Sequence, residues 1–251
     1  MKIERGKQQS PPRLFIYGTE GIGKSSLAAS TPAPIFVQTE DGLGQIECDR
    51  FPLATSFDEA YQALVDLEKE EHDYQTVVID SLDWLERLIW DKVCTDFGVK
   101  SIEEADGGYA KGYSYAINYW RRVVLALAKL RRNSMLVVLV AHAKIEKFKD
   151  PESAAYDRFS PRLHKLASSL ITEWCDAVLF ATRKFRTEKD GSGFNERTLA
   201  KPIGAEGGER ILRCVGSPAC VAKNRFNLPA ELPLSWPVLL KHLTGETDGN
   251  T

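Results

Sequence analysis

The chain has 251 residues, of which 43% are hydrophobic and 27% are charged, and its formal net charge is −2. This size and composition are those of a globular protein with a sizeable core. The slightly negative charge excludes a global basic field, so a nucleic-acid site has to be a local patch. No apolar run reaches the length of a membrane span and the first residues are polar, so we expect neither a membrane partner nor a signal peptide.

The predicted elements alternate between strands and helices along most of the chain. Residues 1–12 end in two prolines, and we expect them to form a flexible lead-in. Continuous apolar runs predict strands, and apolar residues at helical spacing predict helices. The expected strands cover 13–17, 35–38, 76–79, 135–141 and 176–182, and the expected helices cover 25–30, 57–71, 82–97, 115–132 and 163–173. This alternation predicts an α/β fold with a mostly parallel sheet flanked by helices.

The pattern of the sequence changes after residue 183. Short alternating segments separated by Gly-rich turns predict an antiparallel hairpin added at the edge of the sheet. We therefore expect one domain over 13–235 and a C-terminal tail over 236–251 that is partly disordered.

The segment between the first strand and the first helix reads GTEGIGKS and matches the pattern G-x-x-x-x-G-K-[ST]. Glycines allow backbone N–H groups to converge on one point, and the following helix directs its N-terminal dipole to that point. The lysine adds a positive charge, and the serine hydroxyl is a ligand for Mg²⁺. A Gly-rich turn is the alternative, but the flanking strand and helix favour a P-loop that binds ATP. The expected nucleotide-binding residues are Gly18, Thr19, Glu20, Gly21, Ile22, Gly23, Lys24, Ser25 and Ser26.

Acidic residues follow two of the predicted strands. Asp80 ends the third strand and is expected to hold Mg²⁺ together with Ser25, the alternative being a residue that caps the strand or the next helix. Glu40 follows the second strand, on the edge where parallel strands present their carboxyl ends to a ligand. It is the expected base that activates water, because Ser81 and not a glutamate follows Asp80. The alternative for Glu40 is a solvated loop acid.

The order of these motifs resembles that of the RecA-type ATPase core. A P-loop on the first strand, TED after the second, VVID on the third and a polar residue after the fourth occur in the same order in that family. The polar residue is His142, which the resemblance makes a sensor of the γ-phosphate, although RecA has glutamine there and a histidine satisfied by the loop backbone is the alternative. Over residues 12–230 the chain is most similar to short phage-encoded RecA-core proteins of the Sak-type single-strand annealing group. The resemblance implies a RecA-like fold, Mg²⁺-dependent ATP hydrolysis and a role in homologous recombination or annealing.

A late segment, CVAKNRFNLP, extends the resemblance. RecA-like recombinases carry K-N-[KR] late in the core, and these cations reach across a subunit interface to the ATP of the neighbour. Lys223 and Arg225 match these positions. The resemblance therefore implies catalytic cations supplied in trans and a homo-oligomer, either a ring or a helical filament.

Two polar segments, 100–114 and 143–165, match by position the loops with which RecA-type proteins bind single-stranded DNA. The second interleaves cations, which neutralise phosphates, with aromatic rings, which stack on unpaired bases. We expect a long polar loop over 143–161, and a solvated loop with no ligand is the alternative because acidic residues also lie there. The expected DNA-binding residues are Lys144, Lys147, Phe148, Lys149, Arg158, Phe159 and Arg162.

Together these motifs predict an ATPase that acts on single-stranded DNA, with a single-strand-binding protein as a further partner. An ATP-binding adaptor with little turnover is one alternative, and a small-molecule kinase is another, although no clear lid segment is visible. The five cysteines form no C-x-x-C pair, and their odd number argues against a disulfide framework. This usage indicates a cytoplasmic protein, located in the host bacterial cytoplasm if it is phage-encoded.

Overall fold

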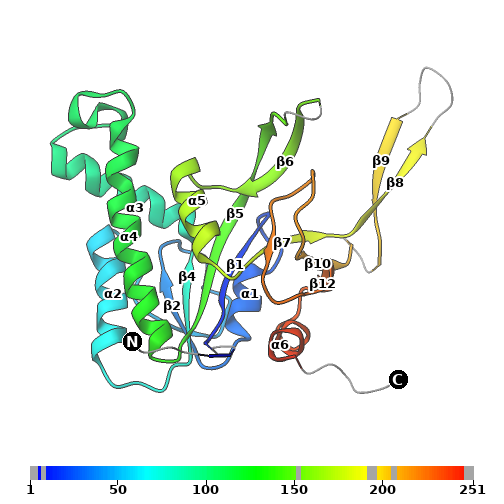
Figure 1. Ribbon diagram of the computed structural model, residues 1–251, viewed down its shortest axis with the longest axis horizontal. Coiled ribbons are helices and arrows are strands. Elements are labelled where there is room, and N and C mark those ends of the chain that lie inside the picture. The colour runs from blue at the N-terminus through cyan, green and yellow to red at the C-terminus, as the bar shows by residue number, and fades with distance from the viewer. Residues whose placement is uncertain (1–4, 7–9, 151–153, 191–196, 205–207, 246–251) are drawn as a thin grey trace.

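A mostly parallel β-sheet lies at the centre of the protein, between two layers of helices (Figure 1). The computed structural model describes residues 5–6, 10–150, 154–190, 197–204 and 208–245. The main path of the sheet has the strand order β12-β10-β7-β1-β5-β4-β2-β3, with β6 paired to β5 and β11 paired to β7. The strands of this sheet are β1 (Arg13–Gly18), β2 (Pro34–Gln38), β3 (Asp49–Arg50), β4 (Thr76–Asp80), β5 (Leu136–Phe148), β6 (Tyr156–Pro161), β7 (Ala177–Arg183), β10 (Arg210–Arg213), β11 (Lys223–Asn224) and β12 (Glu231–Pro233).

Strand β1 shows why the sheet requires helices on both faces. Phe15 and Tyr17 pack into one buried cluster, whereas Leu14 and Ile16 pack into the other, because side chains alternate across a strand. The first cluster lies under α2, α3, α4 and α5, and the second lies under α1 and α6. The helices are α1 (Lys24–Ala29), α2 (Phe57–Lys69), α3 (Leu82–Phe97), α4 (Lys111–Arg132), α5 (Lys165–Trp174) and α6 (Trp236–Thr244), with a 3₁₀ segment η1 (Ile102–Gly107) before α4.

The predicted α/β fold with a RecA-like arrangement is confirmed. The P-loop strand β1 has β5 and β7 as parallel neighbours, and one strand separates it from β4, which ends in Asp80. The antiparallel edge is also present, but it is made by β10 and β12. The predicted hairpin is a separate two-stranded sheet, β8 (Phe185–Asp190) with β9 (Arg197–Pro202), and the residues 191–196 between its strands lie outside the described residues.

The expected polar loop over 143–161 is wrong. Strand β5 continues to Phe148 and pairs antiparallel with β6, so a β-hairpin projects beyond the edge of the sheet (Figure 1). Its residues are polar on much of both faces because the hairpin leaves the core. This polarity is the reason that the sequence predicted a loop in place of a strand. Residues 151–153, between the two strands, lie outside the described residues.

The expected tail begins as a helix. Residues 236–244 form α6, and Trp236 and Leu239 are buried against the sheet. Residues 246–251 of the tail, and residues 1–4 and 7–9 of the expected lead-in, lie outside the described residues. Among the helices of the described residues, none is both long and apolar enough to cross a membrane.

Candidate functional site

The loop between β1 and α1 lines a pocket of about 530 Å³ at the carboxyl end of β1. Gly21 and Gly23 have φ values of 67° and 106°, a conformation that glycine adopts without the strain that a Cβ would cause. A Cβ at Gly21 would meet no atom within 4 Å, so this part of the backbone is open to a ligand. This geometry lets backbone N–H groups approach phosphate oxygens closely, as the P-loop sequence predicts.

Lys24 carries a positive charge inside this pocket. It is only 6% exposed, and its Nζ donates hydrogen bonds to the carbonyl oxygens of Gly18 at 3.1 Å and Thr19 at 2.9 Å. Burial lowers the pKa of Lys24, and nearby carboxylates, with Asp80 the strongest, act in the opposite direction. Lys24 is therefore a cation that the loop's own backbone holds in place among carboxylates.

Asp80 and Ser25 are the residues that fit a divalent cation. Asp80 is buried at the end of β4, and burial raises its pKa while a hydrogen bond from Ser25 acts against that shift. A carboxylate beside a hydroxyl matches the oxygen ligands that Mg²⁺ prefers, and Mg²⁺ commonly takes only one or two protein side chains at nucleotide sites. These two side chains would hold Mg²⁺, which would neutralise charge on the phosphate oxygens.

Glu40 is held at the pocket by the end of the neighbouring strand. Its Oε2 accepts a hydrogen bond from the Ser81 hydroxyl at 2.9 Å, and its carboxylate lines the pocket. The Thr39 hydroxyl donates to the carbonyl of Ser81 at 2.6 Å and accepts from the Ser81 N–H at 3.0 Å. These bonds join the carboxyl ends of β2 and β4, so Glu40 and Asp80 are presented together, as the sequence predicted from the sheet edge.

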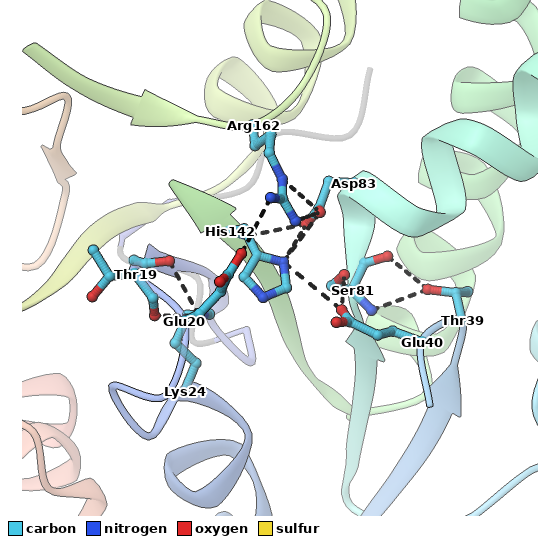
Figure 2. A network of polar contacts seen from close by, with 10 residues as sticks. Thr19, Glu20, Lys24, Thr39, Glu40, Ser81, Asp83, His142 and Arg162 are labelled. Atoms are coloured by element: carbon cyan, nitrogen blue, oxygen red, sulfur yellow. Dashed lines mark hydrogen bonds and ion pairs between the residues drawn. The ribbon is translucent and has the colours of Figure 1, made fainter. Parts of the chain in front are cut away.

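Asp83 is the centre of a buried network that the sequence analysis did not single out (Figure 2). It accepts hydrogen bonds from the His142 backbone N–H at 2.9 Å and from His142 Nδ1 at 3.1 Å, and Arg162 donates to it at 3.1 and 2.8 Å. Burial alone would raise the pKa of Asp83, but these hydrogen bonds outweigh burial and hold it well below its usual range. Asp83 is therefore an ionised hydrogen-bond acceptor.

The bond to Asp83 fixes the tautomer of His142. A carboxylate only accepts, so Nδ1 carries a hydrogen and donates it. The same Nδ1 lies 3.8 Å from Glu40 Oε2, and His142 lines the pocket (Figure 2). The Nε2 atom can donate to a further partner only in the imidazolium form, in which both ring nitrogens carry hydrogens. The predicted alternative, a histidine bonded only to loop backbone, does not describe this contact.

Arg162 lies in this network and not in a segment that faces DNA, as the DNA-binding prediction expected. Its guanidinium bonds Asp83 and reaches Glu20 of the P-loop at 3.4 Å (Figure 2). Because Arg162 directly follows β6, it joins the hairpin to the nucleotide pocket.

The side chains of three other predicted DNA-binding residues contact groups of the chain itself. Lys144 donates to the carbonyl of Leu163 at 2.8 Å. Arg158 lies 3.8 Å from the centre of the Phe148 ring and pairs with Glu146 at 3.3 Å. The side chain of Lys144 therefore holds the base of the hairpin, and Arg158 covers one face of the aromatic ring that was expected to stack on a base.

The remaining predicted DNA-binding residues divide between core and surface. The Phe159 ring stacks on Phe180 with centroids 4.9 Å apart, so it belongs to the protein's own packing. Ile145, which is 64% exposed, and the exposed Lys147 alternate along β5, and the exposed Lys149 follows the last residue of that strand. Ile145 and Lys147 share one face of the strand, since successive side chains point to opposite faces.

The predicted trans cations lie at the amino end of β7, away from the P-loop, which follows the carboxyl end of β1. Lys223 donates to the backbone carbonyls of Thr172, Glu173 and Cys175 at 2.7–2.8 Å, which satisfies the C-terminal end of α5. All three hydrogens of its ammonium are used, so its role in the described chain is structural. Arg225 pairs with Asp176 at 3.3 Å and keeps 53% of its side chain exposed.

Arg210 lines the pocket and was missed by the sequence analysis. It lies on β10, beyond β7 from the P-loop strand, and its Nη1 reaches the carbonyl of Ile22 at 3.5 Å. No short motif marks this arginine, because only the sheet topology brings β10 to the P-loop.

Glu86, one turn after Asp83 on α3, is a second buried acid below the hairpin. Its Oε2 accepts from the His164 backbone N–H at 2.8 Å at the start of α5, and burial raises the pKa of Glu86 to about 7. Since the unfolded value is near 4.5, this group favours the folded state below that pH, and the contribution is lost as pH rises through about 7.

We expect Glu86→Gln to remove this pH dependence. At pH 5 the variant and the unmodified protein should unfold at similar urea concentrations, whereas at pH 8 the variant should be more stable by about 2–3 kcal/mol. The same change at the exposed Glu71 is the control. Parallel pH profiles for Glu86→Gln and the unmodified protein would contradict the prediction.

The fold and the pocket define a P-loop nucleotide-binding domain, in which β1 carries the phosphate loop and β4 carries the metal-binding acid. Residues 10–226 match the family described as AAA domain, and the chain belongs to that family. This membership confirms the predicted P-loop class.

Two further similarities place the chain among known proteins. It is 25% identical over 138 residues to the SPbeta prophage-derived uncharacterized protein YorG of Bacillus subtilis (strain 168), a match that covers 53% of this chain and 42% of the relative. The chain thus aligns with less than half the length of that relative. Among solved structures, the RadB recombinase matches with a TM-score of 0.46 and 15% identity, over 88% of this chain and 85% of that one.

Proposed function

We propose that this chain is a Mg²⁺-dependent ATPase that acts on single-stranded DNA, in phage homologous recombination or single-strand annealing. Membership of the AAA domain family and the P-loop pocket support nucleotide hydrolysis. The motif order that resembles the RecA core supports the DNA substrate, and the similarity to a prophage-derived protein supports the phage context.

The observation that carries the proposal is the position of the β5–β6 hairpin over the nucleotide pocket. Gly18, the first residue of the P-loop, lies opposite His142 in the pairing of β1 with β5, so the hairpin begins one residue beyond the level of the pocket. Asp83 then bonds both sides of the hairpin base, through His142 on β5 and Arg162 after β6. A change in charge at the pocket therefore acts on groups that hold the hairpin.

Each pocket residue has a separate role in the proposed hydrolysis. Lys24 places a positive charge against the phosphates, and Asp80 with Ser25 would hold Mg²⁺. Glu40 takes a proton from the attacking water, and the Ser81 hydroxyl orients the Glu40 carboxylate. As an imidazolium, His142 donates from Nε2 to the γ-phosphate while Asp83 accepts from Nδ1 on the other side of the ring.

The DNA-binding surface of the proposal is the exposed face of the hairpin formed by Ile145, Lys147 and Lys149. Lys147 near the end of β5 and Lys149 just after it neutralise phosphates, and the apolar side chain of Ile145 offers a contact for a base or sugar. Asp157 lies opposite Lys147 and reduces the local charge, so the surface is a modest patch.

Replacing both lysines, as Lys147→Gln with Lys149→Gln, should weaken binding of single-stranded DNA about 3- to 10-fold at moderate salt. The slope of log affinity against log salt should fall by about 1.4, since each phosphate contact on a single strand contributes about 0.7. Fluorescence anisotropy of a labelled oligonucleotide at several salt concentrations measures both quantities.

The matched control changes two exposed cations at the ends of α2 and α4, Lys69→Gln with Arg132→Gln. This pair removes the same charge away from the hairpin and should leave the slope unchanged. Equal affinity and equal salt slope in the hairpin variant and the unmodified protein would show that this face does not bind DNA.

We further propose that subunits assemble and that Arg225 acts on the ATP of a neighbour. Arg225 is half exposed, and its partner Asp176 is already bonded by Arg13 at 2.5 Å and 3.0 Å, so Arg225 can turn outward without leaving a carboxylate unpaired. A cation supplied in trans makes hydrolysis depend on assembly.

ATP hydrolysis by the full chain, measured with and without single-stranded DNA, tests the proposed function. We expect Mg²⁺-dependent phosphate release that DNA stimulates. ATP binding without turnover would indicate the adaptor instead, and transfer of phosphate to a small acceptor would indicate a kinase.

A further inference from the structure

Arg210 approaches the P-loop from the side opposite the catalytic acids. In the sheet order, β5, β4 and β2 lie on one side of β1 and supply His142, Asp80 and Glu40, whereas β7 and β10 lie on the other. Arg210 is the first residue of β10 and lines the pocket from that other side. One side of the pocket therefore carries two acids and a histidine, and the other side carries an arginine.

The backbone of Arg210 is fixed on both sides. It pairs with Arg183 on β7, and its carbonyl accepts a hydrogen bond from the Leu234 N–H at 3.0 Å. The guanidinium lies directly over the P-loop: a Cβ placed on Gly23 would come within 2.9 Å of Arg210 Nη1. The absence of a side chain at Gly23 thus makes room for this arginine.

The charge of Arg210 has no internal partner in the described part of the chain, where no carboxylate lies within ion-pair distance of its guanidinium. The hydrogen bond that its Nη1 donates to the carbonyl of Ile22 is a long one, at 3.5 Å. Arg162 and Arg225, in contrast, each pair with a buried aspartate. An arginine held at an anion-binding loop with its donors unused is suited to bind an anion.

We propose that Arg210 binds the α-phosphate of the nucleotide. The inference rests on the proposed nucleotide function of the pocket. The γ-phosphate faces Glu40 and His142, so the anionic group farthest from it along the triphosphate faces the opposite side, where Arg210 lies. Lys24 lies between the two sides, and Arg210 supplies a second cation to a pocket that also holds three carboxylates, those of Glu20, Glu40 and Asp80.

Both ATP and ADP carry an α-phosphate, so Arg210→Ala should weaken both to the same extent. We expect the Kd of each to rise about 10- to 100-fold, as for loss of a charge-assisted hydrogen bond. With saturating ATP, kcat should change less than about 3-fold, because the contact is the same in the ground state and the transition state. Isothermal titration calorimetry gives the two Kd values, and steady-state hydrolysis gives kcat.

Arg210→Lys keeps the charge but loses the planar pair of donors, and it should recover part of the affinity. Arg213→Ala is the matched control, because Arg213 lies on the same strand, pairs with Glu231 at 3.6 Å and does not line the pocket. It should bind both nucleotides normally.

The outcomes separate this inference from the proposed function. If the unmodified protein binds neither nucleotide, the nucleotide function itself fails. If it binds both and Arg210→Ala binds them equally well, only the role of Arg210 is overturned. Weakened binding of ATP with unchanged binding of ADP would also overturn it, because that result assigns Arg210 to the γ-phosphate.

Discussion

Replacing Lys24 with alanine is expected to abolish tight ATP binding and turnover. The ammonium is buried and donates to the carbonyls of Gly18 and Thr19, so the loop itself holds this charge in the pocket. Without this cation, the carboxylates of the pocket face the phosphates with no positive charge from Lys24 to offset the repulsion between them. Calorimetric titration with ATP and measurement of phosphate release should both show a loss of at least about 100-fold.

Lys144→Ala is the control for Lys24→Ala. It also removes a lysine that donates to a backbone carbonyl, that of Leu163, but it lies outside the pocket and should leave ATP affinity unchanged in the absence of DNA. Thermal melting of both variants checks that they fold. Normal ATP affinity and turnover in a folded Lys24→Ala protein would show that the loop is not a phosphate-binding site.

Glu40→Gln should leave ATP binding intact and lower kcat by about 100-fold or more. The amide keeps an oxygen that accepts the Ser81 hydrogen bond, so the position of the side chain is preserved while its ability to take a proton is lost. Single-turnover hydrolysis separates this chemical step from nucleotide binding.

Glu20→Gln is a matched control, because Glu20 lines the same pocket but has 76% of its side chain exposed and no contact with Ser81. It should reduce kcat far less than Glu40→Gln does. An unchanged kcat in Glu40→Gln would show that Glu40 is not the base.

The Glu40→Gln protein also tests action between subunits. Mixed with Arg225→Ala, it can form an interface that joins the intact Glu40 of one subunit to the intact Arg225 of another. Part of the activity should therefore return in the mixture, in proportion to the share of mixed interfaces. Failure to recover activity in samples that electron microscopy shows to be co-assembled would argue against Arg225 as a trans cation.

The parts of this protein that the sequence predicted are those with local signals. The P-loop is eight consecutive residues between an apolar strand and a helix, and the buried strands are continuous apolar runs. Asp80 could be placed because it directly follows such a run, and Glu40 because it lies three positions after another.

The parts that the sequence did not predict depend on contacts between distant residues. Asp83 meets His142 and Arg162 across 59 and 79 positions, and Arg210 meets Ile22 across 188. Before the fold is known, Asp83 is indistinguishable from a first-turn helix acid, and Arg162 from one more cation in a polar segment. The strands of the hairpin were missed for a different reason, since a strand that leaves the core loses the apolar pattern by which buried strands are recognised.

The attachment of both hairpin strands to Asp83 has a mechanical consequence. From His142 to Phe148, strand β5 extends about 20 Å at about 3.3 Å per residue. Because pairing with β6 stiffens it and Asp83 bonds both strands at the base, a rotation of the hairpin would turn it as one body about the buried carboxylate. A rotation of about 5° around this carboxylate displaces the far end by about 2 Å over that length. The displacement grows with distance from Asp83. A shift at the pocket no larger than a change of hydrogen-bond partner therefore becomes a displacement at Lys147 and Lys149 of more than half the spacing between stacked bases.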